Sequence, residues 1–131
     1  MEQTLIIIKP DGVRRNLTGK ILSIFELKGL QLCDLSFTNL TDDQVKKHYN
    51  KFLEKDFFPR ILRFMTSGPV VIAVFKGYNA IKYTRKLIGA TNPIEDEPNT
   101  IRGMFATGIE ENVIHASENM SEFVREHIIY F

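Results

Sequence analysis

A short run near the C-terminus, NVIHAS, gathers residue types that can do chemistry. Asn112, His115 and Ser117 lie where a brief apolar stretch gives way to small polar residues. An imidazole at the end of a strand either fills a gap at the edge of the core or does chemistry, since its pKa lies near neutrality. Asn112 and His115 point to opposite faces of an ideal strand, so both can reach one ligand only if a bulge or turn lies near Asn112.

Three basic residues occupy positions where they could bind an anion. Lys9 follows the apolar run Leu5–Ile8 at the end of a predicted central strand. Arg85 and Arg102 flank the loop that contains Thr91, and two guanidinium groups beside a hydroxyl could clamp a phosphate chain. The alternatives are a lysine that extends to solvent from a strand end and a pair of solvated surface charges.

One acidic residue could orient the imidazole, and two other kinds of site fit the sequence poorly. Glu126 lies one turn after Phe123 at the border of the apolar face of the last predicted helix, although a surface acid is the alternative. The histidines never occur at zinc-ligand spacing and Cys33 is the only cysteine, so no protein-built metal site is expected. No G-x-S-x-G motif is present, which disfavours a serine hydrolase.

Length and composition predict one globular domain over residues 1–131. With 44% hydrophobic and 25% charged residues the chain resembles an average globular protein. The net charge of +1 gives no global argument for binding nucleic acid or a membrane, and neither partner is expected. A single cysteine suits a reducing compartment, and the N-terminal apolar run is too short for a signal peptide, so a cytoplasmic location is expected.

The hydrophobic pattern predicts an α/β fold of the α+β type. Strands are predicted over Thr4–Lys9, Leu30–Leu40, Val70–Phe75 and Val113–His115, and helices over Thr18–Lys28, Thr41–Asn50, Asp56–Met65, Ala80–Ile88 and Ser121–Ile128. Thr91–Asn99 is predicted to be an exposed loop. This order is a βαββαβ arrangement with additions, the ferredoxin-like sandwich: a four-stranded antiparallel sheet with helices on one face plus added helices.

Several segments occur in an order that resembles the nucleoside diphosphate kinase family. They are IIIKPDGV, KKHY, SGPVV, GATNP, NTIRG and NVIHAS, and together they extend over nearly the whole chain. The resemblance implies an enzyme that moves the terminal phosphate of a nucleoside triphosphate to a nucleoside diphosphate. The implied mechanism is ping-pong through a phosphohistidine, with broad tolerance of base and sugar. Mg²⁺ is the implied cofactor, held mainly by the substrate phosphates rather than by protein ligands.

The resemblance also implies roles for individual residues. His115 matches the nucleophile and Glu126 the acid that fixes its tautomer, and Lys9 and Tyr49 are implied to be catalytic as well. The residues that match substrate contacts are Lys9, Arg85, Arg102, Tyr49, Thr91 and Ser117 around the phosphates, Asn112 at the ribose, and Phe57, Ile61 and Ile109 around the base.

The sequence departs from the family pattern at a few positions, and other readings compete. Met104 stands where the family usually has an acid, Ala116 where many members have glycine, and Tyr130 where the family has tryptophan. A catalytically weak member that serves as a nucleotide-binding or scaffolding module is the main alternative. A ferredoxin-like regulatory domain is another, but it would leave NVIHAS unexplained. The strand Leu30–Leu40 could pair with its copy, and the family implies a homo-oligomer, a tetramer or hexamer built from dimers.

Overall fold

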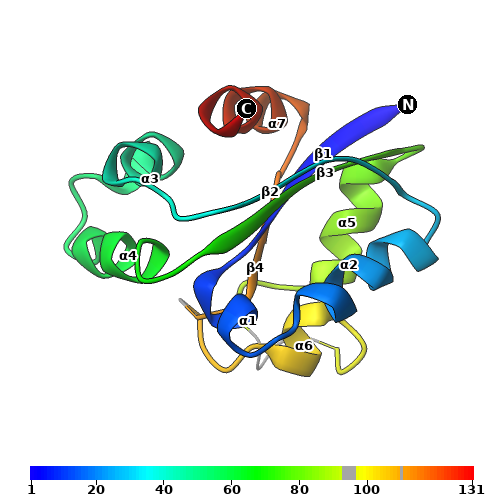
Figure 1. The fold of residues 1–131 in the computed structure, drawn as a ribbon, viewed down its shortest axis with the longest axis horizontal. Coiled ribbons are helices and arrows are strands. Elements are labelled where there is room, and N and C mark those ends of the chain that lie inside the picture. Colours follow the sequence, from blue (N-terminus) through cyan, green and yellow to red (C-terminus); the bar gives the residue numbers. More distant parts are fainter. Residues whose placement is uncertain (93–96, 110) are drawn as a thin grey trace.

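A four-stranded antiparallel sheet with the strand order β2-β3-β1-β4 organises the molecule (Figure 1). The computed structural model describes residues 1–92, 97–109 and 111–131. The strands are β1 (Glu2–Ile8), β2 (Gln31–Thr38), β3 (Val70–Gly77) and β4 (Ile114–Ala116). β1 pairs with β3 on one side and with β4 on the other, so that Ile7 lies between Ile72 and His115. The first strand of the chain therefore lies next to the residue most suited to chemistry.

Helices cover both faces of this sheet (Figure 1). The helices on one side are α1 (Pro10–Arg14), α2 (Thr18–Leu27), α5 (Ala80–Ile88) and α6 (Ile101–Phe105), and those on the other are α3 (Asp42–His48), α4 (Phe58–Met65) and α7 (Met120–Tyr130). α2 and α5 are the two helices of the βαββαβ unit, while α3, α4 and α7 are the additions. The predicted ferredoxin-like arrangement is confirmed.

The apolar run of β1 supplies both hydrophobic cores. Ile6 and Ile8 pack toward α2, where they meet Ile21 and Phe25, and every one of these side chains is fully buried. Leu5 and Ile7 point the opposite way into a second core with Val45 of α3 and Met65 of α4. A strand buried on both faces needs apolar residues at every position, which explains the unbroken LIII sequence.

β2 differs from β1 because it lies at the edge of the sheet, where β3 is its one partner strand among the described residues. Leu35 is 50% exposed and Phe37 is 68% exposed, whereas every residue of β1 from Thr4 onward is buried. A register shift between Leu32 and Asp34 interrupts the ladder. The prediction of a half-exposed antiparallel strand over Leu30–Leu40 is confirmed, with bounds of Gln31–Thr38.

Helix ends follow the capping residues in the sequence. Thr41 caps α3 through a reciprocal pair of hydrogen bonds: its hydroxyl accepts from the Gln44 amide at 3.1 Å, and the Gln44 side chain accepts from the Thr41 amide at 3.0 Å. The predicted helix Ala80–Ile88 has those bounds in the structure. The expectation that α3 continues to Asn50 was wrong, because the chain leaves the helix after His48 and forms a 3₁₀ turn over Asn50–Phe52.

Two short helices were not predicted. α1 begins at Pro10, directly after β1, and α6 follows Thr100, whose hydroxyl accepts from the Gly103 amide at 3.0 Å. Each is five residues long, too short for a hydrophobic period to be visible. Within the predicted loop Thr91–Asn99, residues 93–96 lie outside the described residues. Among the residues that the structure does describe, no helix is long and apolar enough to cross a membrane.

Gly103 is expected to tolerate no side chain. A Cβ atom there would lie 2.0 Å from the Glu97 carbonyl oxygen and 2.8 Å from the Thr100 hydroxyl. Gly103→Ala should therefore destabilise the protein by about 1–3 kcal/mol and lower the Tm by roughly 3–10 °C in a calorimetric scan. Gly19→Ala on α2 is the matched control, because a Cβ at Gly19 meets nothing within 4 Å. Equal Tm values for the two variants would contradict the prediction.

Candidate active site

A tight turn brings Asn112 and His115 to the same site. The Asn112 carbonyl accepts a hydrogen bond from the Ile114 amide at 2.9 Å, and Val113 between them has a φ of +77°. An i to i+2 hydrogen bond around a positive-φ residue is a γ-turn of the rare, strained kind. A β-branched residue in this conformation costs on the order of 1–3 kcal/mol. The turn is the irregularity that the sequence spacing required, and it lies where a functional site would hold strain.

A buried carboxylate fixes the orientation of His115. Glu126 projects from α7 and is only 2% exposed, so it is not the surface acid of the alternative interpretation. Its Oε2 lies 2.8 Å from His115 Nε2, and its Oε1 accepts a hydrogen bond from the Ser117 hydroxyl at 2.5 Å. A carboxylate accepts rather than donates, so Nε2 of His115 carries the proton. Nδ1 then keeps its lone pair on the opposite side of the ring.

Burial and charge act on both members of this pair. Burial lowers the pKa of His115 well below its usual value of 6.5, and the cations Lys9, Arg102 and Arg85 act in the same direction. A lowered pKa means that the neutral imidazole dominates near pH 7. Burial raises the pKa of Glu126, while its contact with His48 and its hydrogen bond from Ser117 oppose that rise.

Lys9 stands at the junction of β1 and α1, beside the γ-turn. Its ammonium group donates to Asn112 Oδ1 at 2.8 Å, and its backbone amide donates to the Val113 carbonyl at 2.7 Å. The side chain is mostly buried, with the whole residue 9% exposed. Lys9 is thus a cation held in place at the site rather than a lysine extending into solvent.

The two arginines are oriented by backbone carbonyls around β4. Arg102 from α6 donates to the Gly89 carbonyl at 3.1 Å and to the Ile114 carbonyl at 2.7 Å. Arg85 from α5 donates to the Ala116 carbonyl at 3.2 Å. These carbonyls orient the two guanidinium groups toward the candidate site, where they could bind an anion.

A cavity of about 460 Å³ joins the predicted site residues. Its lining includes Lys9, Tyr49, Phe57, Ile61, Arg85, Thr91, Arg102, Ile109, Asn112, His115 and Glu126. Ser117 is the exception, since it is fully buried and contacts Glu126 from behind the cavity. Phe57 and Ile61 belong to the start of α4, and Phe57 packs against Phe52 with ring centroids 5.4 Å apart. The cavity therefore combines an apolar part with a cluster of cations.

Sequence reasoning missed His48, which lies beside His115 in the candidate site. His48, at the end of α3, is 4% exposed, and its ring meets that of His115 edge to face at a centroid distance of 4.4 Å. Its Nε2 lies 3.4 Å from Glu126 Oε2, and its Nδ1 lies 2.6 Å from the Tyr130 hydroxyl. The spacing of the histidines along the chain gives no hint of this contact. Only the helical spacing of Val45 and His48 indicates that His48 faces inward.

His48, His115 and Glu126 also form a potential metal-ligand group, with ligand atoms within 4.8 Å of one another. The same cations that depress the pKa of His115, chiefly Lys9 and Arg102, oppose the approach of a further positive ion. The expectation that the protein itself builds no metal site stays a prediction.

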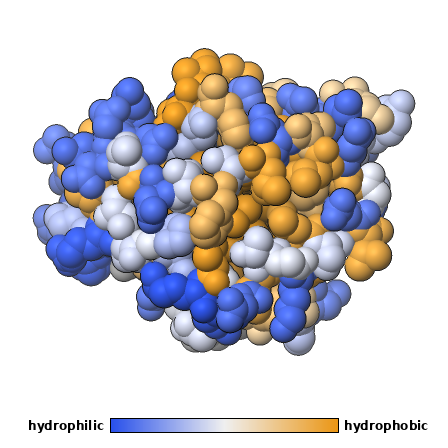
Figure 2. All heavy atoms as spheres, in the orientation of Figure 1, coloured by the Kyte–Doolittle hydropathy of each residue, from blue (hydrophilic) through white to orange (hydrophobic). Residues whose placement is uncertain are grey.

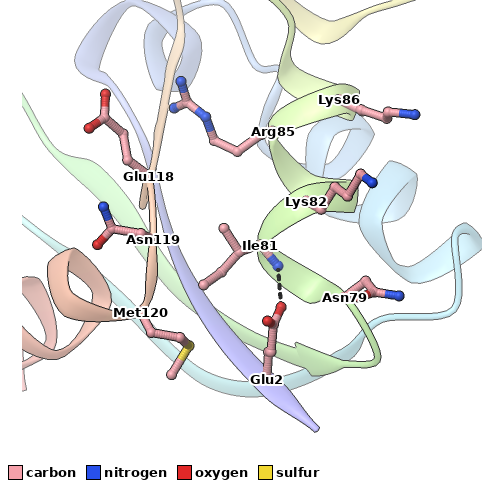
Figure 3. Close-up of a pocket in the computed structure, with 9 residues that line it drawn as sticks. All are labelled: Glu2, Asn79, Ile81, Lys82, Arg85, Lys86, Glu118, Asn119 and Met120. Atoms are coloured by element: carbon pink, nitrogen blue, oxygen red, sulfur yellow. Dashed lines mark hydrogen bonds between the residues drawn. The ribbon is translucent and has the colours of Figure 1, made fainter.

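A larger and shallower cavity, of about 690 Å³, lies beside the candidate site (Figure 3). It is bordered by α5, the start of β1 and the segment before α7, and it shares Arg85 and Glu118 with the first cavity. The Glu2 carboxylate accepts a hydrogen bond from the Ile81 amide at 3.2 Å, while Lys82 and Lys86 point away from the centre (Figure 3). The lysine side chains of this cavity therefore point apart, whereas the cations of the first cavity gather around His115.

Comparisons with known proteins show the family to which the chain belongs. The sequence model of the nucleoside diphosphate kinase family matches residues 2–131. The chain is 47% identical over 131 residues to the nucleoside diphosphate kinase of Thermus thermophilus, covering 100% of this chain and 96% of that protein.

Solved structures give the same result. A crystal structure of the Aquifex aeolicus nucleoside diphosphate kinase superposes with a TM-score of 0.95 at 39% identity, covering 99% of this chain and 94% of that one. The Halobacterium salinarum enzyme in complex with CDP gives 0.96 at 36% identity, covering 99% and 87%. The chain therefore belongs to the nucleoside diphosphate kinase family and is an enzyme that transfers phosphate from nucleoside triphosphates to nucleoside diphosphates.

Proposed function

We propose that Nδ1 of His115 carries the phosphoryl group between two nucleotides in a ping-pong reaction. Nδ1 attacks the terminal phosphorus of a nucleoside triphosphate, a P–N bond forms, and the P–O bond to the departing diphosphate breaks. A second diphosphate then attacks the phosphohistidine and regenerates the ring. The hydrogen bond between His115 Nε2 and Glu126 at 2.8 Å is the single observation that carries this proposal, because it leaves Nδ1 unprotonated.

Glu126 is also proposed to stabilise positive charge on His115 during transfer. When Nδ1 of the neutral ring forms a bond to phosphorus while Nε2 keeps its proton, the ring becomes positively charged. The buried carboxylate at Nε2 stabilises that charge in a region of low dielectric, where the interaction is stronger than in water.

Lys9, Arg85 and Arg102 are the proposed ligands of the substrate phosphates. Phosphoryl transfer passes through a loose transition state, so positioning and charge neutralisation do most of the catalytic work. The three cations line one cavity with His115, and the hydroxyls of Tyr49 and Thr91 are available as further donors. Hydrogen bonds to backbone carbonyls hold the guanidinium groups in place before the substrate arrives.

Mg²⁺ is the proposed cofactor. Among the described residues, the only cluster of potential metal ligands is His48, His115 and Glu126, and its donors are already engaged with one another. The cavity is lined by cations such as Lys9, Arg85 and Arg102, which would bind phosphates and not a metal ion. This supports a magnesium ion held mainly by the substrate phosphates and not by protein ligands. When bound, the ion supplies charge neutralisation on the phosphates.

The apolar part of the cavity is the proposed base site. Phe57, Ile61 and Ile109 line it, and Asn112 is placed to contact the sugar. Stacking on an aromatic ring accepts any base, because every base presents a π-face. This supports broad tolerance of purine and pyrimidine nucleotides. A role restricted to binding or scaffolding is disfavoured, because the nucleophile, its carboxylate partner and the cations line one cavity.

An exposed apolar surface supports the proposal that the enzyme is a homo-oligomer built from dimers. Leu27 on α2 is 86% exposed, and Leu35 and Phe37 on the edge strand β2 are 50% and 68% exposed. Apolar residues gather over the centre and right of the face shown in Figure 2, the part of the view where α2 and β2 lie in Figure 1. Pairing of β2 with its copy would satisfy the open edge and cover these side chains. Assembly of such dimers into tetramers or hexamers is also proposed.

A cytoplasmic location is proposed as well. Cys33 on β2 is exposed and unpaired, which suits a reducing compartment, and the proposed substrates are nucleotides. Residues 1–131 are proposed to act as one catalytic domain.

His115→Ala is expected to abolish transfer, with a loss on the order of 10³-fold or more in kcat, because the attacking nitrogen is removed. Incubation with γ-labelled ATP should label the wild type and leave the variant unlabelled. The label should be lost in acid and survive alkali, as a phosphohistidine does, whereas a phosphate ester on Ser117 would survive acid. His127→Ala is the control and should be labelled normally. A labelled His115→Ala protein would refute the assignment.

Removal of divalent ions by EDTA is expected to reduce transfer by more than about tenfold, because the charge of the triphosphate is no longer neutralised. Addition of excess Mg²⁺ should restore the rate. The Tm of the substrate-free protein should be the same with and without EDTA, because the ion is held by the nucleotide. A large fall in Tm on chelation would show that the protein itself holds the metal.

Phe37→Glu is expected to break the dimer, because a charge would be buried where two β2 strands meet. Light scattering coupled to size exclusion should report a smaller assembly than for the wild type. Leu53→Glu, a similar change at an exposed residue away from β2, is the control. Identical masses for the wild type and both variants would count against dimerisation through this edge.

A further inference from the structure

The buried His48 has no part in the proposed reaction, yet it contacts the centre of the site. It is 4% exposed, stacks on Tyr49 at a centroid distance of 4.5 Å, and lies against His115. A histidine this deeply buried must have its ring nitrogens satisfied, and its two partners are Tyr130 and Glu126. Both partners belong to α7, the helix that supplies the carboxylate.

The proton positions in this cluster follow from the partners. If Nδ1 of His48 donated to Tyr130, its Nε2 lone pair would face the Glu126 carboxylate, which also has only lone pairs to offer. The stable arrangement has the Tyr130 hydroxyl donating to Nδ1 at 2.6 Å and the Nε2–H of His48 directed at Glu126 Oε2 over 3.4 Å. Burial raises the pKa of Tyr130, which keeps this hydroxyl protonated as the donor.

We propose that His48 and Tyr130 are positioning residues for phosphoryl transfer: they hold the Glu126 carboxylate, and through it His115, in the orientation that leaves Nδ1 free to attack. Oε2 of Glu126 then faces two Nε2–H groups, at 2.8 Å from His115 and 3.4 Å from His48, while Oε1 is held by Ser117. The longer contact from His48 is the weaker of the two, so it steers the carboxylate without displacing His115.

The fold holds His48 in place from the other side as well. Arg125, the residue before Glu126, donates to the carbonyls of Lys47 and His48 at 2.8 and 2.9 Å. These are carbonyls of the last turn of α3, which have no partner within the helix. Arg125 thereby joins the end of α3 to α7 at the level of the carboxylate, and His48 moves with Glu126 rather than independently of it.

A neutral His48 also suits the reaction. Burial lowers the pKa of His48 well below 6.5, and the proximity of His115 lowers it further. A charged ring 4.4 Å from His115 would oppose the positive charge that develops there during transfer. The hydrogen bond from Tyr130 reinforces the neutral state, since it occupies the nitrogen that would otherwise take up a proton.

Tyr130→Phe tests this inference, which rests on the proposed role of His115. The change removes one hydroxyl and keeps the ring. In a single-turnover experiment with γ-labelled ATP, the rate of His115 phosphorylation should fall by about threefold to tenfold, the effect of one lost hydrogen bond. The apparent KM for ATP should stay close to wild type, and the Tm should fall by no more than a few degrees, as expected for one lost hydrogen bond. Tyr83→Phe, at an exposed tyrosine on α5, is the matched control and should leave the rate unchanged.

A second pair of variants acts on the ring itself. His48→Leu removes the N–H donor and should slow phosphorylation at least as much as Tyr130→Phe. His48→Gln keeps an amide donor and should recover part of the rate, which a purely space-filling role would not predict.

Long-range ¹H–¹⁵N spectra of the imidazole rings provide a readout that is independent of activity. In the wild type, His48 and His115 should both carry the proton on Nε2, and in Tyr130→Phe the His48 ring should become a mixture of tautomers. A wild-type His48 protonated on Nδ1, a normal rate in Tyr130→Phe, or a fall in rate matched by an equal loss of ATP affinity and a fall in Tm of more than about 10 °C would each overturn the inference. Failure of the wild type to form an acid-labile label would overturn the proposed role of His115 instead.

Discussion

The buried carboxylate of Glu126 is the constraint on which the rest of the site depends. A charge that is 2% exposed must be surrounded by hydrogen-bond donors, or it would be too unstable to keep ionised. His115 of β4 and Ser117 after β4 make hydrogen bonds to this carboxylate, and Nε2 of His48 at the end of α3 lies 3.4 Å from it. Satisfying one carboxylate therefore locks three elements together.

Much of the fold could be predicted from the sequence because the burial of its longer elements produces recognisable hydrophobic patterns. β1 is buried on both faces and its sequence is an unbroken apolar run, whereas apolar and polar residues alternate in the edge strand β2. Thr41 is a typical N-cap residue and marks the start of α3. α1 and α6 were missed because five residues are too few to show a helical period. β4 was predicted one residue too early. Val113 forms the γ-turn before the strand, and a β-branched residue gives no sequence signal for a positive φ.

The candidate site was predictable to the extent that its residues match family segments or lie at element ends. His115 and Lys9 stand beside apolar runs, and the need for a turn near Asn112 followed from strand geometry alone. The contact of His48 with Glu126 and Tyr130 did not follow from any spacing, because α3 and α7 are far apart in the sequence and touch only in the folded structure. A tertiary hydrogen-bond network between distant helices leaves no periodic signal in a sequence.

The place of β4 in the sheet explains how the cations are held. Within the described part of the chain β4 is an edge strand that pairs with β1 alone, so the carbonyls of Ile114 and Ala116 on its outer side have no strand partner there. Arg102 and Arg85 donate to these two carbonyls. An open edge that would otherwise invite pairing with another strand is thereby capped by guanidinium groups. The same hydrogen bonds fix those charges beside His115, so one arrangement both protects the sheet edge and builds the proposed phosphate site.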